Sequence, residues 1–157
     1  MRRQGNPGKR TGGWALDVTL DEKDHSILNL LRTDSRMPIR DIAKKTGIRP
    51  STVHQRIQRL RTSGVIEKFT IKVNNKAFGE NFIVFMLVTT EGELTKAFTE
   101  DHRLKEMFGI TGEYDLLLKF KFKDVNEFNE YIISARKQAE IKKTLTMVVT
   151  TTVKEEL

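Results

Sequence analysis

The chain has 157 residues, of which 38% are hydrophobic, so it can bury one medium core or two small ones. It contains no cysteine, which excludes disulfides and thiolate-based zinc or iron–sulfur sites. Its three histidines stand far apart, so we expect no metal and no cofactor. No apolar run approaches the roughly 20 residues of a membrane span, and no apolar segment follows the basic N-terminus as in a signal peptide, which predicts a cytoplasmic protein.

The formal net charge of +7 is divided unevenly along the chain. Residues 1–80 carry a balance of +9, whereas residues 81–157 carry a balance of −2. The first half therefore suits a polyanion, and the second half does not. Charge alone leaves open whether that polyanion is DNA, RNA or a membrane surface.

Residues 1–19 are predicted to form a flexible basic tail, because they hold many glycines and almost nothing to bury. Solvated disorder and an arm that follows the minor groove of DNA are both consistent with this composition. Trp14 and Leu16 break the polar pattern and are candidates to dock the tail onto a neighbouring element. The basic residues of the tail are Arg2, Arg3, Lys9 and Arg10.

Three helices are predicted to follow, in residues 20–64. The first has a capping residue, Thr19 or Asp21, in front of it. Gly47 tolerates the left-handed backbone that ends the second helix, and Pro50 pre-sets the first turn of the third. The second and third helices, with the short turn between them, make a helix-turn-helix.

The third helix is a candidate for reading DNA. Its apolar stripe consists of Val53, Ile57 and Leu60, and its outward face carries hydrogen-bonding side chains with no acid among them. Such side chains can pair with base edges in a major groove, and flanking arginines can hold phosphates. An ordinary solvated surface helix is the alternative. The outward face comprises Ser51, Thr52, Gln55, Gln58 and Arg59, and the flanking arginines are Arg49, Arg56 and Arg61.

Residues 65–80 are predicted to form a wing and a connector. Asn74 and Asn75 are a turn signal, and the residues before them are rich in strand formers. A small hairpin or wing is therefore expected beside the three helices. The strand-forming residues are Val65, Ile66, Phe69, Ile71 and Val73.

Residues 81–157 alternate strand and helix signals, and they are predicted to form one α+β domain. The predicted order βαββαβ is that of a ferredoxin-like sandwich. The expected elements are a strand over residues 82–89, a helix over 93–107, a strand over 108–111, a strand over 116–122, a helix marked by Val125, Phe128, Ile132 and Ala135, and a last strand with Ile141, Leu145, Met147, Val149 and Val153 on one side.

The strand over residues 82–89 also predicts a homodimer. It is apolar on both faces, whereas two helices cover only one face of a sheet. The simplest cover for the other face is the same sheet of a second copy. A dimer suits the first half as well, because paired helix-turn-helix domains bind two half-sites.

The first half resembles the N-terminal domain of the Lrp/AsnC (feast/famine) transcription regulators. One departure is Arg49, which stands where that family usually has a helix-capping Ser. The matching residues fall in the order and spacing of the family: Leu20, Asp21, Asp24, Ile27, Leu28, Arg36, Ile42, Ala43, Gly47, Ser51, Val53, Arg56, Leu60, Gly64, Val65 and Ile66.

The second half resembles the effector-binding (RAM) domain of the same family, so the likeness spans about residues 18–155. Thr111–Asp115 matches a glycine-acidic-aromatic-aspartate turn, and Thr144, Thr146–Val149, Val153 and Lys154 match the last strand. The resemblance implies dimers that assemble further, often into octamers, with an amino acid bound between dimers near the turn. It implies that Gly112, Glu113, Tyr114 and Asp115 shape this pocket. A purely structural turn, capped by Asp115, is the alternative.

These features together favour a sequence-specific DNA-binding transcription regulator that is modulated by a small molecule such as an amino acid. The DNA-contacting residues are then expected to be Arg49, Ser51, Thr52, Gln55, Arg56 and Arg59. An architectural protein that compacts DNA with little sequence preference is the alternative. An enzyme is not expected, because no nucleophile beside a base, no paired acids with an evident role and no phosphate-binding glycine loop are recognisable.

Overall fold

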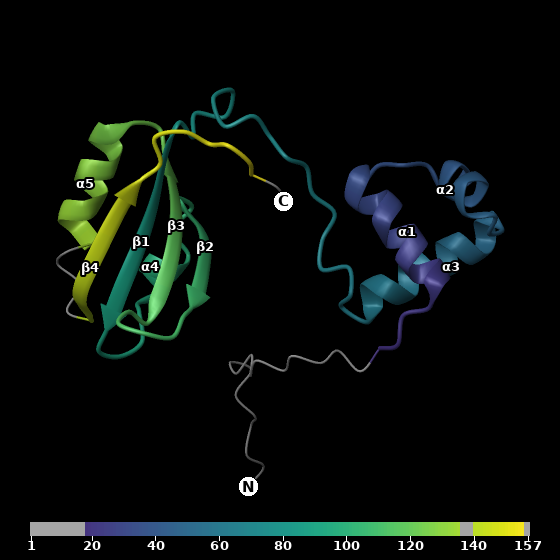
Figure 1. Cartoon of the computed structure of the whole chain (residues 1–157), viewed down its shortest axis with the longest axis horizontal. Helices are drawn as coiled ribbons and strands as arrows, with labels where there is room; N and C mark the ends of the chain where they lie inside the picture. Colours follow the sequence, from purple (N-terminus) through teal and green to yellow (C-terminus); the bar gives the residue numbers. More distant parts are fainter. Residues whose placement is uncertain (1–17, 136–139, 156–157) are drawn as a thin grey trace, which may run out of the picture. The chain divides into compact units, whose positions relative to one another are not determined.

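The computed structural model describes residues 18–135 and 140–155. It divides into two compact units, of which the first ends at Ile71 and the second begins at Lys72 (Figure 1). Most of the predicted basic tail, including Trp14 and Leu16, lies outside the described residues. Within the described ranges, no helix is both long and apolar enough to cross a membrane.

The first unit begins with helix α1 (Glu22–Thr33), whose start is fixed by reciprocal hydrogen bonds. The Asp21 carboxylate accepts from the backbone N–H of Asp24 at 2.8 Å, and the Asp24 carboxylate accepts from the N–H of Asp21 at 3.2 Å. Two of the backbone donors that a helix start leaves unpaired are satisfied in this way. The capping residue is therefore Asp21 rather than Thr19.

The helix-turn-helix is confirmed. Helix α2 (Ile39–Thr46) ends at Gly47, whose φ is 68°, and helix α3 (Pro50–Thr62) has proline in its first turn. The three helices enclose a core in which Ile27, Ile42 and Val53 are fully buried. A small apolar core of this kind fixes the direction in which the other side of α3 points.

The predicted wing is wrong. Residues 65–73 form no strand, and Ile71 is 67% exposed. The alternating residues have strand propensity, but a strand also needs a neighbouring strand for its backbone hydrogen bonds, and the described chain offers none here. The turn predicted at Asn74 is confirmed, because its side chain accepts from the N–H groups of Lys76 and Ala77 at 2.9 and 3.2 Å.

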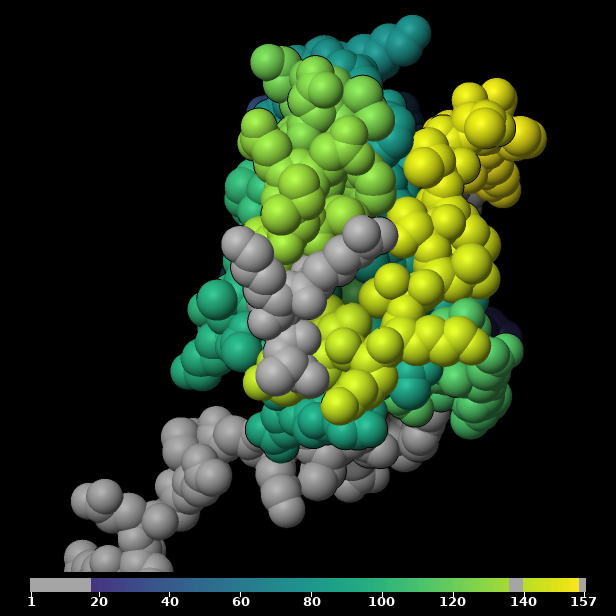
Figure 2. Space-filling view, turned by 90° about the vertical axis from the view of Figure 1, so that its left-hand side faces the viewer, coloured from purple at the N-terminus to yellow at the C-terminus, as the bar shows by residue number. Residues whose placement is uncertain are grey.

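The second unit is a four-stranded antiparallel sheet with two helices, in the predicted order βαββαβ. The strand order is β2-β3-β1-β4, and the long helix α5 lies beside β4 in both views (Figures 1 and 2). The elements are β1 (Phe82–Thr90), α4 (Lys96–Thr99), β2 (Leu104–Gly109), β3 (Leu116–Phe122), α5 (Val125–Ala135) and β4 (Ile141–Val148).

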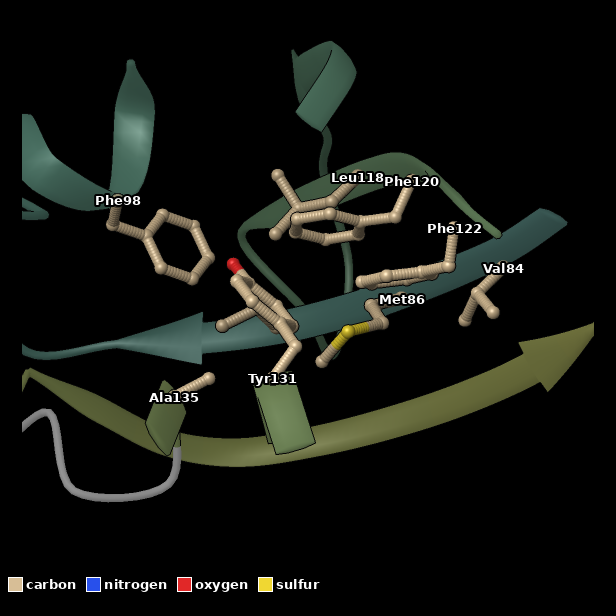
Figure 3. Close-up of a cluster of buried hydrophobic side chains, with 9 residues drawn as sticks. Val84, Met86, Phe98, Leu118, Phe120, Phe122, Tyr131 and Ala135 are labelled. Carbon is tan, nitrogen blue, oxygen red and sulfur yellow. The ribbon is translucent and has the colours of Figure 1, made fainter. Parts of the chain in front are cut away.

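The core of the second unit lies between the helices and one face of the sheet. Figure 3 shows the side chains of β1 and β3 meeting those of α4 and α5. The aromatic rings of Phe120, Phe122 and Tyr131 lie with their centroids 5.1 to 5.8 Å apart, within the range of favourable aromatic pairing. This packing fixes α5 on the sheet.

The helix predicted over residues 93–107 is wrong. Only Lys96–Thr99 is helical, and β2 already begins at Leu104. The Asp101 side chain accepts from the backbone N–H of Arg103 at 2.9 Å, which makes a turn that competes with helix continuation. Beyond this turn the backbone pairs with β3, with Met107 opposite Leu118.

The last strand also differs from its prediction. Strand β4 ends at Val148, and Val153 beyond it is 94% exposed. A register shift at Thr89/Thr90 separates residues that were expected on one side. Ile141 packs on the helix-covered core, whereas Leu145 lies opposite Leu87, on the other face of the sheet.

That other face, which we call the open face, is apolar, and none of the described helices covers it. Leu117, Leu87 and Leu145 lie side by side in one row across β3, β1 and β4. In the next row, Phe85 lies between Lys119 and Met147. Leu145 and Met147 are 45% and 42% exposed.

The lysines of the open face are neutralised by acids. Glu155, from the segment after β4, pairs with Lys119 at 2.7 Å and with Lys121 at 3.1 Å. Lys119 also pairs with Glu106 at 3.0 Å. Hydrogen bonds from these lysines lower the pKa of Glu155 to about 2. The open face therefore presents apolar side chains among paired charges.

Candidate functional site

The outward face of α3 is solvent-exposed, as predicted. Val53 and Leu60 are fully buried and Ile57 is half-buried, so the predicted apolar stripe faces the core. Ser51, Gln55 and Gln58 are exposed on the opposite side of the helix, and Thr52 is half-buried. These polar side chains are therefore accessible to a binding partner.

Arg56 is held inside the first unit. Its guanidinium donates hydrogen bonds at 2.8 Å to both carboxylate oxygens of Asp21 and to the carboxylate of Asp24. The hydrogen bond from Arg56 lowers the pKa of Asp21 to about 2, and the same contacts raise the pKa of Arg56. In the structure, Arg56 connects α3 to the start of α1. That it contacts DNA stays a prediction.

Asp24 lies at the centre of this ion-pair cluster, and the sequence analysis did not place it near α3. Its carboxylate is fully buried, and it accepts from Arg56, from Arg59 and from the backbone N–H of Asp21. A buried charge is tolerated when it is paired and hydrogen-bonded in this way. A signal was present in the sequence, since Arg56 and Arg59 are three residues apart on one helical face and Asp24 is three residues from its capping partner.

The remaining predicted cations lie at the two ends of α3. Arg49 is the N-cap residue, and it makes no side-chain capping hydrogen bond, as its identity predicts. It is exposed at the positive end of the helix dipole, where an anion such as a phosphate is favoured. Arg61 is exposed at the other end, with its guanidinium carbon 5.9 Å from the centre of the Phe69 ring.

The turn predicted to bind an effector is fastened to the ends of β1 and β4. The Asp115 carboxylate accepts from the backbone N–H of Thr90 at 2.8 Å, which supports the structural alternative for this residue. The Glu113 carboxylate pairs with Lys143, whose ammonium nitrogen also lies 5.1 Å from the centre of the Tyr114 ring. Both acids of the turn are therefore already engaged within the chain.

Gly112 takes a backbone conformation that favours glycine. Its φ is 127°, and a Cβ built there would meet no atom within 4 Å. The conformation, rather than crowding, is the reason for a glycine at this position. Gly112 and Glu113 are exposed at the surface, so their backbone groups are accessible to a ligand or to another copy of the chain.

No group of three or more His, Asp or Glu side chains in the described part of the chain is arranged to hold a metal ion. Arg56 and Arg59 of α3 and Glu113 of the turn are engaged in ion pairs, and Asp115 accepts a backbone hydrogen bond.

Two family models match the chain. The model of the AsnC-type helix-turn-helix domain matches residues 20–61, and the model of the Lrp/AsnC ligand binding domain matches residues 83–157. The two matches correspond to the two compact units and together cover most of the sequence.

Relatives and solved structures agree with these models. The HTH-type transcriptional regulator FL11 of Pyrococcus abyssi is 36% identical over 144 residues, which cover 89% of this chain and 95% of the relative. An AsnC family regulator from Agrobacterium tumefaciens has a similar fold, with a TM-score of 0.80 at 22% identity over 87% of this chain and 94% of that one. A Neisseria meningitidis regulator solved with L-methionine has a TM-score of 0.77 at 21% identity, over 88% and 94% of the chains.

Proposed function

Since the chain belongs to the Lrp/AsnC family of transcription regulators, we propose that it reads specific DNA sites with the exposed face of α3. The observation that carries this proposal is the division of α3 into a buried stripe of Val53 and Leu60 and an acid-free polar face with Gln55 at its centre. Glutamine can pair with adenine edges, and Arg49 at the helix start suits a phosphate. Ser51, Thr52, Arg56 and Arg59 complete the proposed interface.

Arg56 and Arg59 have a second role in this proposal. Their ion pairs with α1 orient α3, so that part of their contribution to DNA binding is indirect. Arg59 remains 50% exposed, which leaves guanidinium N–H groups for a phosphate. Arg56 is 21% exposed and contributes mainly through orientation.

Replacement of Gln55 by alanine should weaken binding to the best operator by about tenfold, because a good side-chain contact to a base contributes roughly 1–3 kcal/mol. Binding to scrambled duplex should change little, since phosphate contacts persist. The measurement is a mobility-shift titration of the full chain on both duplexes at fixed salt.

The matched control is Asn29→Ala, which removes an exposed amide from α1. It should leave both affinities unchanged. If Gln55→Ala bound the operator as tightly as the wild-type chain, the proposed reading face would be wrong. Equal affinity of the wild-type chain for operator and scrambled duplex would support the alternative of an architectural DNA-compacting protein, which the transcriptional regulators among the relatives do not favour.

We further propose that the regulator acts in the cytoplasm as a homodimer formed through the open face, and that dimers assemble to octamers. The exposed side chains of Leu145 and Met147, in neighbouring rows of the open face, support the dimer, because contiguous apolar surface of this kind is usually covered by a partner. Residues 20–64 then act as the DNA-binding domain, residues 65–80 as the connector and residues 81–157 as the domain for assembly and effector binding. Two copies present two α3 helices to a roughly palindromic operator.

An amino acid is the proposed effector, bound near residues 112–115 between dimers. The L-methionine in the Neisseria meningitidis structure supports this ligand class. The exposed turn with Gly112, Glu113, Tyr114 and Asp115 provides backbone groups and carboxylates for a zwitterion. Since Glu113 is paired with Lys143, the ammonium group of a ligand would replace the ammonium group of Lys143.

Alanine substitutions at two glycines test whether the 112–115 turn binds an amino acid. Replacement of Gly112 by alanine should cost about 1 kcal/mol of stability and weaken amino-acid binding severalfold, because an L-residue is strained at this φ. Gly109→Ala is the control, since its φ is ordinary and a Cβ there also meets open space. Thermal unfolding and calorimetric titration with a panel of amino acids measure the two effects. Equal ligand affinity in both variants would argue against a binding role of the turn.

A further inference from the structure

A cavity of about 250 Å³ lies on the helix-covered side of the sheet, between α4 and α5. It is lined by both apolar and polar side chains. The apolar ones are Ala97, Phe98 and Ala135, and the polar ones include Arg103, Glu130 and Tyr131. None of its lining residues belongs to α3 or to the 112–115 turn, so neither proposed site accounts for it.

The Tyr131 hydroxyl is the unusual group in this cavity. Tyr131 is 7% exposed, and its hydroxyl oxygen has no hydrogen-bond partner although it is buried. Figure 3 shows this oxygen directed toward Phe98, away from Phe122 and the rest of the ring cluster. A buried hydroxyl without a partner destabilises a folded protein, whereas phenylalanine would fill the same space without this cost. A hydroxyl at this position is therefore better explained by a hydrogen bond to a bound molecule than by packing within the core.

The charges around the cavity favour a cation. Arg103 is neutralised by Asp101, to which it donates two hydrogen bonds of 2.8 and 2.6 Å, and its guanidinium carbon lies 4.6 Å from the centre of the Tyr131 ring. Glu127 lies 3.9 Å from the same guanidinium. The Glu130 carboxylate is left exposed and without an ion-pair partner among the described residues.

The hydroxyl of Tyr131 keeps its proton in this environment. Burial, together with the nearby carboxylate of Asp101, raises the pKa of Tyr131 above its ordinary value. The neutral hydroxyl can accept a hydrogen bond through its oxygen, and its own proton is available for a second hydrogen bond. A ligand that brings N–H donors and a positive charge satisfies both the Tyr131 oxygen and the Glu130 carboxylate.

We propose that the cavity between α4 and α5 binds a small primary amine. Its ammonium group pairs with the Glu130 carboxylate and, once the side chains that cover the buried hydroxyl move aside, donates to the Tyr131 oxygen, while its short apolar body rests on Phe98 and the two alanines. The volume is slightly below the range of common ligand pockets, so the ligand is a molecule of a few heavy atoms and not a peptide.

Three four-carbon probes with different head groups test the charge preference: n-butylamine, n-butanol and butyrate. The full chain is labelled at alanine methyl groups, because Ala97 and Ala135 line the cavity and Ala43 lies in the core of the other unit as an internal reference. We expect butylamine to shift the Ala97 and Ala135 signals with a Kd on the order of 1–10 mM. Butanol should bind about fivefold more weakly, and butyrate should leave the signals unchanged.

Two substitutions test whether Glu130 and Tyr131 contact the amine. Glu130→Gln and Tyr131→Phe should each weaken butylamine binding by about threefold, as expected for one exposed charge pair or one hydrogen bond. Tyr131→Phe should also unfold at the same or a higher temperature than the wild-type chain, which separates loss of a ligand contact from loss of structure. The control Glu93→Gln, an exposed acid outside the cavity, should change neither quantity.

Several results would overturn the proposal. The cavity does not recognise amines if neither methyl shifts at about 50 mM butylamine, which is well above the expected Kd. Equal shifts with butylamine and butyrate would contradict the charge preference. Unchanged butylamine affinity in Tyr131→Phe would mean that the buried hydroxyl is not a ligand contact. None of these results bears on DNA reading by α3, which is tested separately.

Discussion

Replacement of Asp24 by alanine should destabilise the first unit by about 3 kcal/mol and reduce operator binding by tenfold or more. The buried carboxylate holds Arg56 and Arg59, and it also accepts from the N–H that starts α1. Loss of a buried, hydrogen-bonded charge typically costs 3–5 kcal/mol when the partner charges stay buried. Here the two arginines are 21% and 50% exposed and can be rehydrated, so the lower end applies.

The loss of DNA affinity follows from the position of the cluster. Asp24 does not lie on the outward face, yet it links α1 to two residues of α3 that are one turn apart. Without it, α3 keeps only the contact of Arg56 with Asp21 on this side. A reading helix that is less firmly oriented must lose conformational freedom when it binds, and this weakens the complex.

Two substitutions make the measurement specific. Asp24→Asn keeps an oxygen that can accept from the Asp21 N–H but removes the charge, so it should lose about half as much stability as Asp24→Ala. Glu67→Gln, at an exposed acid of the same unit, should be neutral. Urea unfolding is followed by far-UV circular dichroism, to which α1, α2 and α3 of the first unit contribute together with α4 and α5 of the second. If Asp24→Ala were as stable as the wild-type chain, the ion pairs of Asp24 with Arg56 and Arg59 would not stabilise the first unit.

The contrast between Asp24 and its neighbours shows which features sequence patterns can predict. The limits of α1, α2 and α3 depend on local signals such as the Asp21 cap, the left-handed Gly47 and Pro50, and each lies where the pattern places it. The partners of Asp24 are 32 and 35 residues away in the chain. A pattern within one helix carries little information about such a contact, although the spacing of Arg56 and Arg59 hints at a shared partner.

The two wrong elements have a common physical cause. Residues 93–107 place apolar side chains such as Leu94, Phe98 and Leu104 at helical intervals, but the last of them pairs with Phe120 in the sheet. Residues 65–73 alternate like a strand, but no strand lies beside them in the described chain. Whether a segment becomes a strand depends on its neighbour in space, whereas a helix satisfies its own backbone.

The candidate sites were predicted to different degrees. The outward face of α3 could be predicted, because burial of Val53 and Leu60 alone decides which way Gln55 points. The engagement of Arg56 with α1 could not be predicted, and neither could the cavity beside Tyr131, because both depend on contacts between distant segments. Whether an amino acid binds at residues 112–115 stays a prediction.

Introduction of a charge on the open face, at strand β4, should separate the proposed dimer. In Leu145→Glu, the new carboxylate replaces a side chain that is 45% exposed in the single chain, so the fold of the second unit should be retained. In a twofold dimer, both copies of the carboxylate would be buried against the apolar rows of the partner. Burial of an unpaired charge costs several kcal/mol, so the dimer dissociation constant should rise by at least about 100-fold.

The same strand supplies the control. Thr144 is exposed and lies opposite Val88, so it points to the other face of the sheet from Leu145. Thr144→Glu adds the same charge to the same edge strand and should leave the dimer intact. Sedimentation velocity at micromolar concentration compares the masses, and circular dichroism confirms that both variants are folded. A wild-type mass for Leu145→Glu would place the interface elsewhere.

Leu145→Glu should also bind the operator more weakly than the wild-type chain. The size of this loss shows whether it comes from the loss of the dimer. Linkage of two DNA-binding units makes the second contact intramolecular, which can raise affinity by about 10² to 10⁴ without any new contact. Leu145→Glu should therefore bind a duplex with two half-sites no more than about twofold better than a single half-site, because each copy then binds alone. Its affinity for the single half-site should equal that of the wild-type chain, since α3 and the Asp24 cluster lie in the other unit. A variant that lost half-site binding as well would have been damaged in its DNA-binding unit, and the open face would then not be the cause.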